Sequence, residues 1–101
     1  MSLAAVSMSE PGVLRLTGVL DYTSGAALRA EGKALIAASG ESRMMLDCSG
    51  VTHSSSVGLA LLLSFMRDAE AAGKFWELRG LPQELREIAE VYDLGEVLSG
   101  D

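Results

Sequence analysis

The chain has 101 residues and a formal net charge of −6 at pH 7, with 49% hydrophobic, 22% charged and 5% aromatic residues. This composition is typical of one soluble globular domain, spanning residues 1–101, with an aliphatic core. The acidic balance and the scattered basic side chains argue against binding to nucleic acid or to anionic lipid surfaces. The longest apolar run, residues 57–63, is far below the ~20 residues of a membrane span, and the N-terminus has no signal-peptide pattern, so we expect a cytoplasmic protein.

The first half of the chain predicts two strands, a helix and a third strand. Residues 4–18 predict two short strands around a turn at Glu10, Pro11 and Gly12, because Pro and Gly favour turns. Residues 25–40 predict a helix, since apolar or small residues recur there at helical spacing. The residues on that face are Leu28, Gly32, Leu35 and Ile36. Residues 43–49, RMMLDCS, form a short apolar run with polar ends, the pattern of a strand that is buried on both faces.

Residues 57–72 predict a second helix, which Gly73 ends. One of its faces carries Leu59, Leu62, Leu63 and Met66, and a neighbouring face carries Leu61 and Phe65. This is more apolar surface than one core-facing stripe requires. Exposed apolar patches with a polar rim mark protein-binding faces, so we predict that Leu61 and Phe65 belong to such a face. The alternative is that Leu61 and Phe65 pack under a neighbouring helix.

The C-terminal part predicts one more strand and one more helix. Residues 74–80 form the strand, and residues 81–95 the helix, with Pro82 in its first turn. The apolar face of this helix consists of Leu81, Leu85, Ile88, Ala89 and Tyr92. Because strands alternate with helices, the fold class is α/β, with a mixed or parallel central sheet and helices packed on it.

The segment LDCSGVTHSSSVGLALLL, residues 46–63, holds Asp47, His53 and three serines directly before the second helix. These are the residue types of a hydrolase triad, but the glycine two residues before the serine of a nucleophile elbow is missing, which disfavours an enzyme. A serine before a helix commonly caps it, and Ser55 or Ser56 has the right position. A hydroxyl there is also well placed for phosphorylation, because phosphate is stabilised at a helix N-terminus.

No cofactor and no metal are expected. Gly25 and Gly32 are separated by six residues where a phosphate-binding loop needs four, and Ala34 stands where that loop needs Ser or Thr. The chain has one His and one Cys, too few for a zinc site. Cys48 is expected to be a small buried residue.

The same segment resembles the signature of STAS domains, the sulfate transporter and anti-sigma factor antagonist family. Asp47-Cys48-Ser49 matches the family's strand end, and residues 56–59, SVGL, match its helix start. The stretch GVLDYTSGAAL, residues 18–28, is similar to the family's second strand, Leu-Asp turn and first helix. The sequence from GLALLL at residue 58 to the C-terminal helix is similar to the MlaB branch of the family.

The resemblance implies an anti-sigma factor antagonist-like fold and a non-catalytic cytoplasmic subunit. This subunit would bind the ATPase of an Mla-type phospholipid ABC transporter at the inner membrane, without inserting into the membrane, and would support its assembly or activity in maintaining outer-membrane lipid asymmetry. The alternative is an anti-sigma factor antagonist that an anti-sigma factor kinase phosphorylates at Ser56. The predicted partner-binding residues are His53, Ser54, Ser55, Ser56, Val57, Leu61 and Phe65.

Two residues depart from the family pattern beside Ser56. Ser55 stands where the family usually has Asp, and Val57 stands where a small residue is common. Both departures favour a docking surface over a phosphorylation switch, since neither affects docking.

Overall fold

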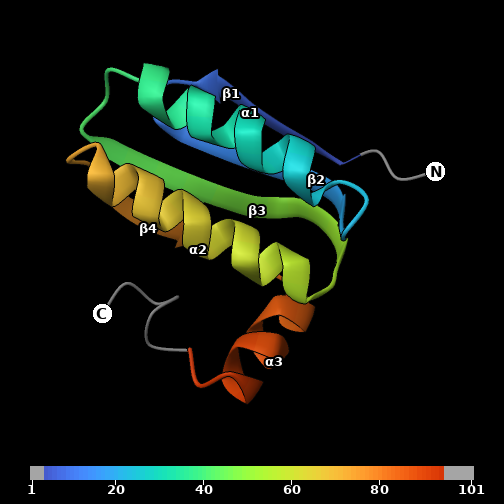
Figure 1. The fold of residues 1–101 in the computed structure, drawn as a ribbon. Helices are drawn as coiled ribbons and strands as arrows, with labels where there is room; N and C mark the ends of the chain where they lie inside the picture. The colour runs from blue at the N-terminus through green and yellow to red at the C-terminus, as the bar shows by residue number, and fades with distance from the viewer. Residues whose placement is uncertain (1–3, 95–101) are drawn as a thin grey trace.

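The computed structural model describes residues 4–94, which alternate strands and helices as the sequence predicts (Figure 1). The strands are β1 (Ala5–Glu10), β2 (Val13–Leu20), β3 (Arg43–Ser54) and β4 (Phe75–Arg79). The helices are α1 (Gly25–Ala38), α2 (Ser56–Ala71) and α3 (Gln83–Val91). Within these residues no helix is long and apolar enough to cross a membrane.

The strands form one mixed sheet in the order β1-β2-β3-β4, which confirms the predicted fold class. β1 and β2 are antiparallel and joined by a tight turn, where Gly12 adopts a φ of 75°. The pairs β2/β3 and β3/β4 are parallel, and each is joined through a helix. Because such crossovers are right-handed and run the same way along the sheet, α1 and α2 cover the same face, as Figure 1 shows.

The core lies between that face of the sheet and the two helices. Alternate strand residues such as Leu14, Leu16, Met44 and Leu46 have no exposed surface. The intervening residues of β2, β3 and β4 point to the opposite face, where Arg15, Asp47 and Arg79 occupy one cross-strand row. Side chains that alternate between the two faces of the sheet are expected where one face is covered by helices and the other is not.

Helices α1 and α2 pack closely because α1 places glycine against α2. A Cβ atom added to Gly32 would lie 2.4 Å from Cε1 of Phe65, so only the glycine leaves room for the ring. Phe65 is completely buried and Leu61 is 3% exposed. The expectation that Leu61 and Phe65 form an exposed binding face is therefore wrong, since the second apolar face of α2 packs against α1.

Strand β3 is longer than predicted. The expected strand covered residues 43–49, but β3 continues through Ser54 and pairs in parallel with the end of β2, where Val19 lies opposite His53 and Leu20 opposite Ser54. Val51 is buried and anchors this second half. The predicted strand ended too early because the polar, exposed residues Thr52 and His53 interrupt the apolar pattern.

The last helix, α3, packs against α2 and β3 through Leu85 and Ala89, which are both buried. Pro82 stands at its N-cap position, just before the first turn. Tyr92 was expected on the buried face, but the helix ends at Val91 and the Tyr92 side chain is 60% exposed, so that prediction was wrong. Residues 95–101, including Gly95 at the predicted end of this helix, lie outside the described residues.

Candidate functional site

The serine cluster lies where β3 ends and α2 begins, and Ser55 is the residue that caps the helix. Its backbone is extended, and its hydroxyl oxygen accepts a hydrogen bond from the N–H of Val57 at 3.2 Å. The Ser55 N–H donates to the carbonyl of Leu20 at 3.0 Å, which ties the cap to the end of β2. The sequence left Ser55 and Ser56 as equal candidates, and the structure assigns the cap to Ser55.

Ser56 is the first residue of α2, and its side chain is exposed. Within residues 4–94 its hydroxyl makes no hydrogen bond, in contrast to those of its neighbours Ser54 and Ser55. Its position next to the unpaired N–H groups of a helix start gives any negative group on Ser56 a favourable environment. The side chain is therefore free to contact a partner or to carry a modification.

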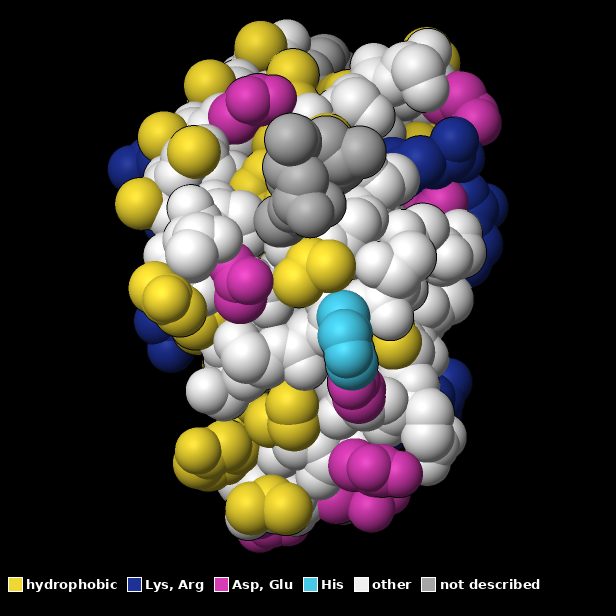
Figure 2. All heavy atoms as spheres, turned by 90° about the vertical axis from the view of Figure 1, so that its right-hand side faces the viewer, with side chains coloured by type: hydrophobic (Ala, Val, Ile, Leu, Met, Phe, Trp, Pro, Cys, Tyr) yellow, Lys and Arg dark blue, Asp and Glu magenta, His cyan; other side chains and the backbone are white. Residues whose placement is uncertain are grey.

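His53 and Ser54 connect this site to α3. The carboxylate of Glu84 accepts a hydrogen bond from the Ser54 N–H at 2.9 Å, and it pairs with Nδ1 of His53 at 2.8 Å. The hydrogen bond with Glu84 and the charge of its carboxylate raise the pKa of His53, and the hydrogen bond with His53 lowers the pKa of Glu84. Figure 2 views this end of the molecule and shows the chain's one histidine exposed at its centre, with acidic and hydrophobic side chains around it.

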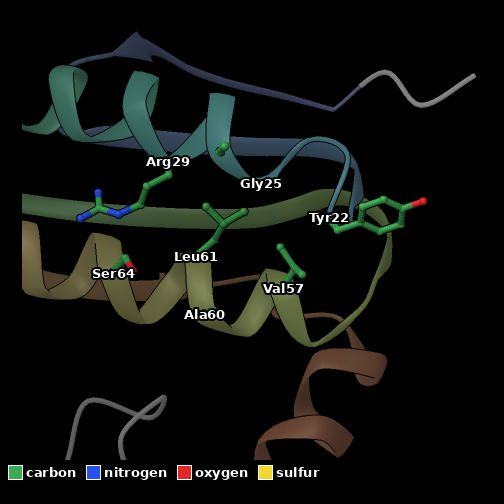
Figure 3. Close-up of a pocket in the computed structure, with 8 residues that line it drawn as sticks. Tyr22, Gly25, Arg29, Val57, Ala60, Leu61 and Ser64 are labelled. Atoms are coloured by element: carbon green, nitrogen blue, oxygen red, sulfur yellow. The ribbon is translucent and has the colours of Figure 1, made fainter.

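A surface groove runs between α1 and α2 next to these serines. Its volume is about 280 Å³. Val57 and Leu61 reach from α2 toward α1 in the groove, with Tyr22 at one end and Arg29 at the other (Figure 3). The full lining consists of Tyr22, Gly25, Ala26, Arg29, Val57, Ala60, Leu61 and Ser64. Leu61 thus contributes only the buried floor of a groove, while Phe65 lies beneath in the core.

The loop from β2 to α1 supplies two residues that sequence analysis did not single out. Tyr22 is 86% exposed at the groove. Asp21 precedes it, and its Oδ1 accepts hydrogen bonds from the hydroxyl and the N–H of Thr23, which hold the pKa of the Asp21 carboxyl below its usual value. The sequence signal that could have identified this part of the site is an aromatic residue next to an Asp, between a predicted strand and a predicted helix.

Asp47 lies on the open face of the sheet, with hydrogen-bond partners different from those a triad needs. Its Oδ2 accepts bonds from Arg15 and Arg79, at 3.2 and 3.1 Å, and its Oδ1 accepts two from Ser49. Burial raises the pKa of Asp47, but the bonds from Ser49 and Arg79 outweigh burial and hold it far below its usual value. The structure does not bring Asp47, His53 and the serines together, because His53 pairs with Glu84 instead.

Cys48 is buried as expected, and burial raises the pKa of its thiol to about 12. A thiol with such a pKa is protonated at neutral pH and is a poor nucleophile and metal ligand. Among residues 4–94, no three His, Cys, Asp or Glu side chains gather in a way that would hold a metal ion. The exposed groups of the site are hydroxyls, the His53 imidazole, carboxylates and apolar side chains.

Comparisons with known proteins agree with this fold. Residues 3–99 match the family model described as "Mlab, STAS domain". The anti-sigma factor antagonist SpoIIAA in its unphosphorylated form is 23% identical with a TM-score of 0.70, over 92% of this chain and 83% of that chain. An anti-sigma factor antagonist from Mycobacterium paratuberculosis is 22% identical with a TM-score of 0.68, over 96% of this chain and 82% of that one.

The Bacillus cell fate determinant SpoIIAA in its phosphorylated form is 24% identical with a TM-score of 0.65, over 92% of this chain and 86% of that chain. At such identities the similarity to solved structures shows a shared fold. The family model, in contrast, covers nearly the whole sequence. On this evidence, the chain belongs to the STAS domain family, and within that family to its MlaB type.

Proposed function

We propose that this chain is a non-catalytic cytoplasmic subunit that binds the ATPase of an Mla-type phospholipid ABC transporter and supports its assembly or activity. The MlaB-type family model supports the choice of partner. The observation that carries the proposal is the start of α2, where the exposed Ser56 stands beside an apolar groove. Protein interfaces combine an apolar centre with a polar rim, and this end of the molecule offers both.

The proposed docking face, defined as His53, Ser54, Ser55, Ser56, Val57 and the groove between α1 and α2, keeps most of the residues that the sequence predicted. Leu61 contributes to it as the floor of the groove. Phe65 does not, because its side chain is fully buried, and it acts only by supporting α2 from below.

The test is co-purification of the chain with the cognate ATPase, followed by measurement of the dissociation constant. Ser56→Glu should weaken binding at least tenfold, because it places a charge in an interface without a built partner for it. Ser42→Glu is the matched control, since Ser42 is equally exposed but precedes β3, while Ser56 follows it. Equal affinities of the two variants, or no binding by the wild type, would contradict the proposal.

A second candidate is an anti-sigma factor antagonist that is phosphorylated at Ser56. The Ser56 hydroxyl at the first position of α2 supports it, because it is exposed and forms no hydrogen bond with the described part of the chain. One solved structure of this fold is described in a phosphorylated form. Incubation with the cognate anti-sigma factor kinase should add one phosphate, which Ser56→Ala abolishes. Absence of incorporation into the folded wild-type chain excludes this candidate and favours the transporter subunit.

A further inference from the structure

The groove between α1 and α2 has the size of a site for one side chain. Pockets for free small molecules usually enclose about 300 to 1,000 Å³ and surround most of the ligand. This groove offers about 280 Å³ and lies at the surface, with Tyr22 and Ala60 exposed at its borders. A large aliphatic or aromatic side chain that arrives on a protein partner fits it better than an independent ligand does.

The lining of the groove determines what that side chain must be. Val57, Ala60 and Leu61 present carbon atoms to it. Arg29 also lines the groove, but its guanidinium binds both carboxylate oxygens of Asp68, with one of the bonds at 3.1 Å, so its charge is already compensated. An inserted carboxylate would have to compete with Asp68, whereas an apolar group displaces only water.

Asp21 directly precedes Tyr22, which is one of the residues that line the groove. Both of its bonds from Thr23 go to Oδ1, and no donor within residues 4–94 binds Oδ2, which can therefore accept from a partner. This carboxyl is ionised at neutral pH, as an ordinary Asp side chain is, and the hydrogen bonds from Thr23 lower its pKa further. A partner that covers Tyr22 also approaches Asp21, and a carboxylate that loses contact with water is disfavoured unless it is paired. The net charge of −6 adds a long-range attraction for basic segments.

We infer that the groove receives one large apolar side chain, of leucine, methionine or phenylalanine size, from a segment of the partner that also carries Lys or Arg to pair with Asp21. This inference rests on the proposed function and defines the partner's contacting segment by its chemistry. Apolar anchors in pockets provide most of the affinity of an interface, and the charge pair at the rim mainly sets specificity and the association rate.

The experiment titrates the full chain with the cognate ATPase and compares two exposed helical alanines. Ala60→Phe fills the groove, while Ala34→Phe places the same side chain on the solvent side of α1. Ala60→Phe should weaken binding at least tenfold, and Ala34→Phe should bind like the wild type. Thermal unfolding of both variants checks that each remains folded.

A second pair of variants tests the charge. Asp21→Asn keeps the oxygen that Thr23 binds but removes the charge, so affinity should fall and should depend less on salt. Glu31→Gln changes an exposed residue on the far side of α1, so it should alter neither the affinity nor its dependence on salt.

The outcomes separate the inference from the proposed function. If Ser56→Glu weakens binding and Ala60→Phe does not, the docking face stands and the inference is overturned. If the wild type fails to bind the ATPase, both are overturned. If Ala60→Phe instead converts a wild-type dimer into monomers on size-exclusion chromatography, a second copy of the chain occupies the groove, which also overturns the inference.

Discussion

The hydroxyl of Ser55 accepts a hydrogen bond from the backbone N–H of Val57 at 3.2 Å, and this bond caps α2 while the side chain of Ser56 stays exposed. Two adjacent serines thus have separate tasks. The family residue that Ser55 replaces, Asp, is an equally good cap. The substitution therefore changes the charge beside Ser56 without loss of the helix start.

This division of tasks predicts the stability of Ser55 variants. Ser55→Ala should lower the free energy of unfolding by about 1 kcal/mol, because an N–H of the first turn loses its acceptor. Ser55→Asp should be at least as stable as the wild type, since a carboxylate caps the helix and also interacts favourably with its positive end. Urea unfolding measures the free energy of unfolding of both variants. Equal destabilisation by Ser55→Ala and Ser55→Asp would show that Ser55 is not the cap.

The contact between Gly32 and Phe65 predicts an unusual response to a helix-favouring substitution. Gly32→Ala should destabilise the protein by about 1–3 kcal/mol, although alanine is the better helix former by about 1 kcal/mol, because its Cβ atom would lie 2.4 Å from the Phe65 ring. Gly40→Ala is the control, since a Cβ atom at Gly40 meets nothing within 4 Å. An increase of stability in Gly32→Ala would refute the tight packing of α1 on α2.

The lowered pKa of Asp47 predicts that the free energy of unfolding decreases at acidic pH. Its pKa is lowered in the folded state, so its contribution is fully present above the unfolded value of about 3.9 and is lost as the pH falls through the folded pKa. Asp47→Asn should cost about 1–3 kcal/mol at pH 7, because the side chain is 2% exposed and accepts four hydrogen bonds.

Urea titrations of wild type and Asp47→Asn between pH 7 and pH 2 check this. The difference in unfolding free energy should stay constant down to about pH 4 and shrink below it. Glu31→Gln is a surface control that should leave the profile unchanged, since Glu31 is exposed. A constant difference over the whole range would mean that the charge of Asp47 is not what stabilises the row of Arg15, Asp47 and Arg79.

The ion pair of His53 and Glu84 predicts a raised pKa of His53. NMR can measure this pKa directly, because the chain has one histidine. The pKa of His53 should lie above its usual value and should fall in Glu84→Gln, which keeps a hydrogen-bond acceptor but loses the charge. A raised folded-state pKa contributes stability at pH values below the unfolded pKa, and this contribution disappears as the pH rises through the folded pKa. An unchanged imidazole titration in Glu84→Gln would show that the ion pair does not form in solution.

The sequence was sufficient for the order of strands and helices, whereas the alternation of these elements left open whether the sheet is mixed or parallel. Periods of two and of 3.6 residues follow from the geometry of a strand and a helix, and the alternation of the elements determines the crossovers. The position of the candidate site was also predictable. Polar residues that directly precede an apolar helix, such as Ser55 and Ser56, mark a helix start whatever packs around it.

Tertiary structure decided which side chains reach the surface. The apolar pattern of α2 gave Leu61 and Phe65 the same expected role as a binding face, but α1 covers both, because Gly25 and Gly32 let the two helices approach. The length of β3 depended on a partner strand, since residues 50–54 pair only with the end of β2. The groove arises from two segments far apart in the chain, residues 22–29 and residues 57–64. Periodicity in the sequence shows which side chains share one face of a helix or strand. Which of them are buried, and where a groove forms, depends on the shape of the neighbouring element.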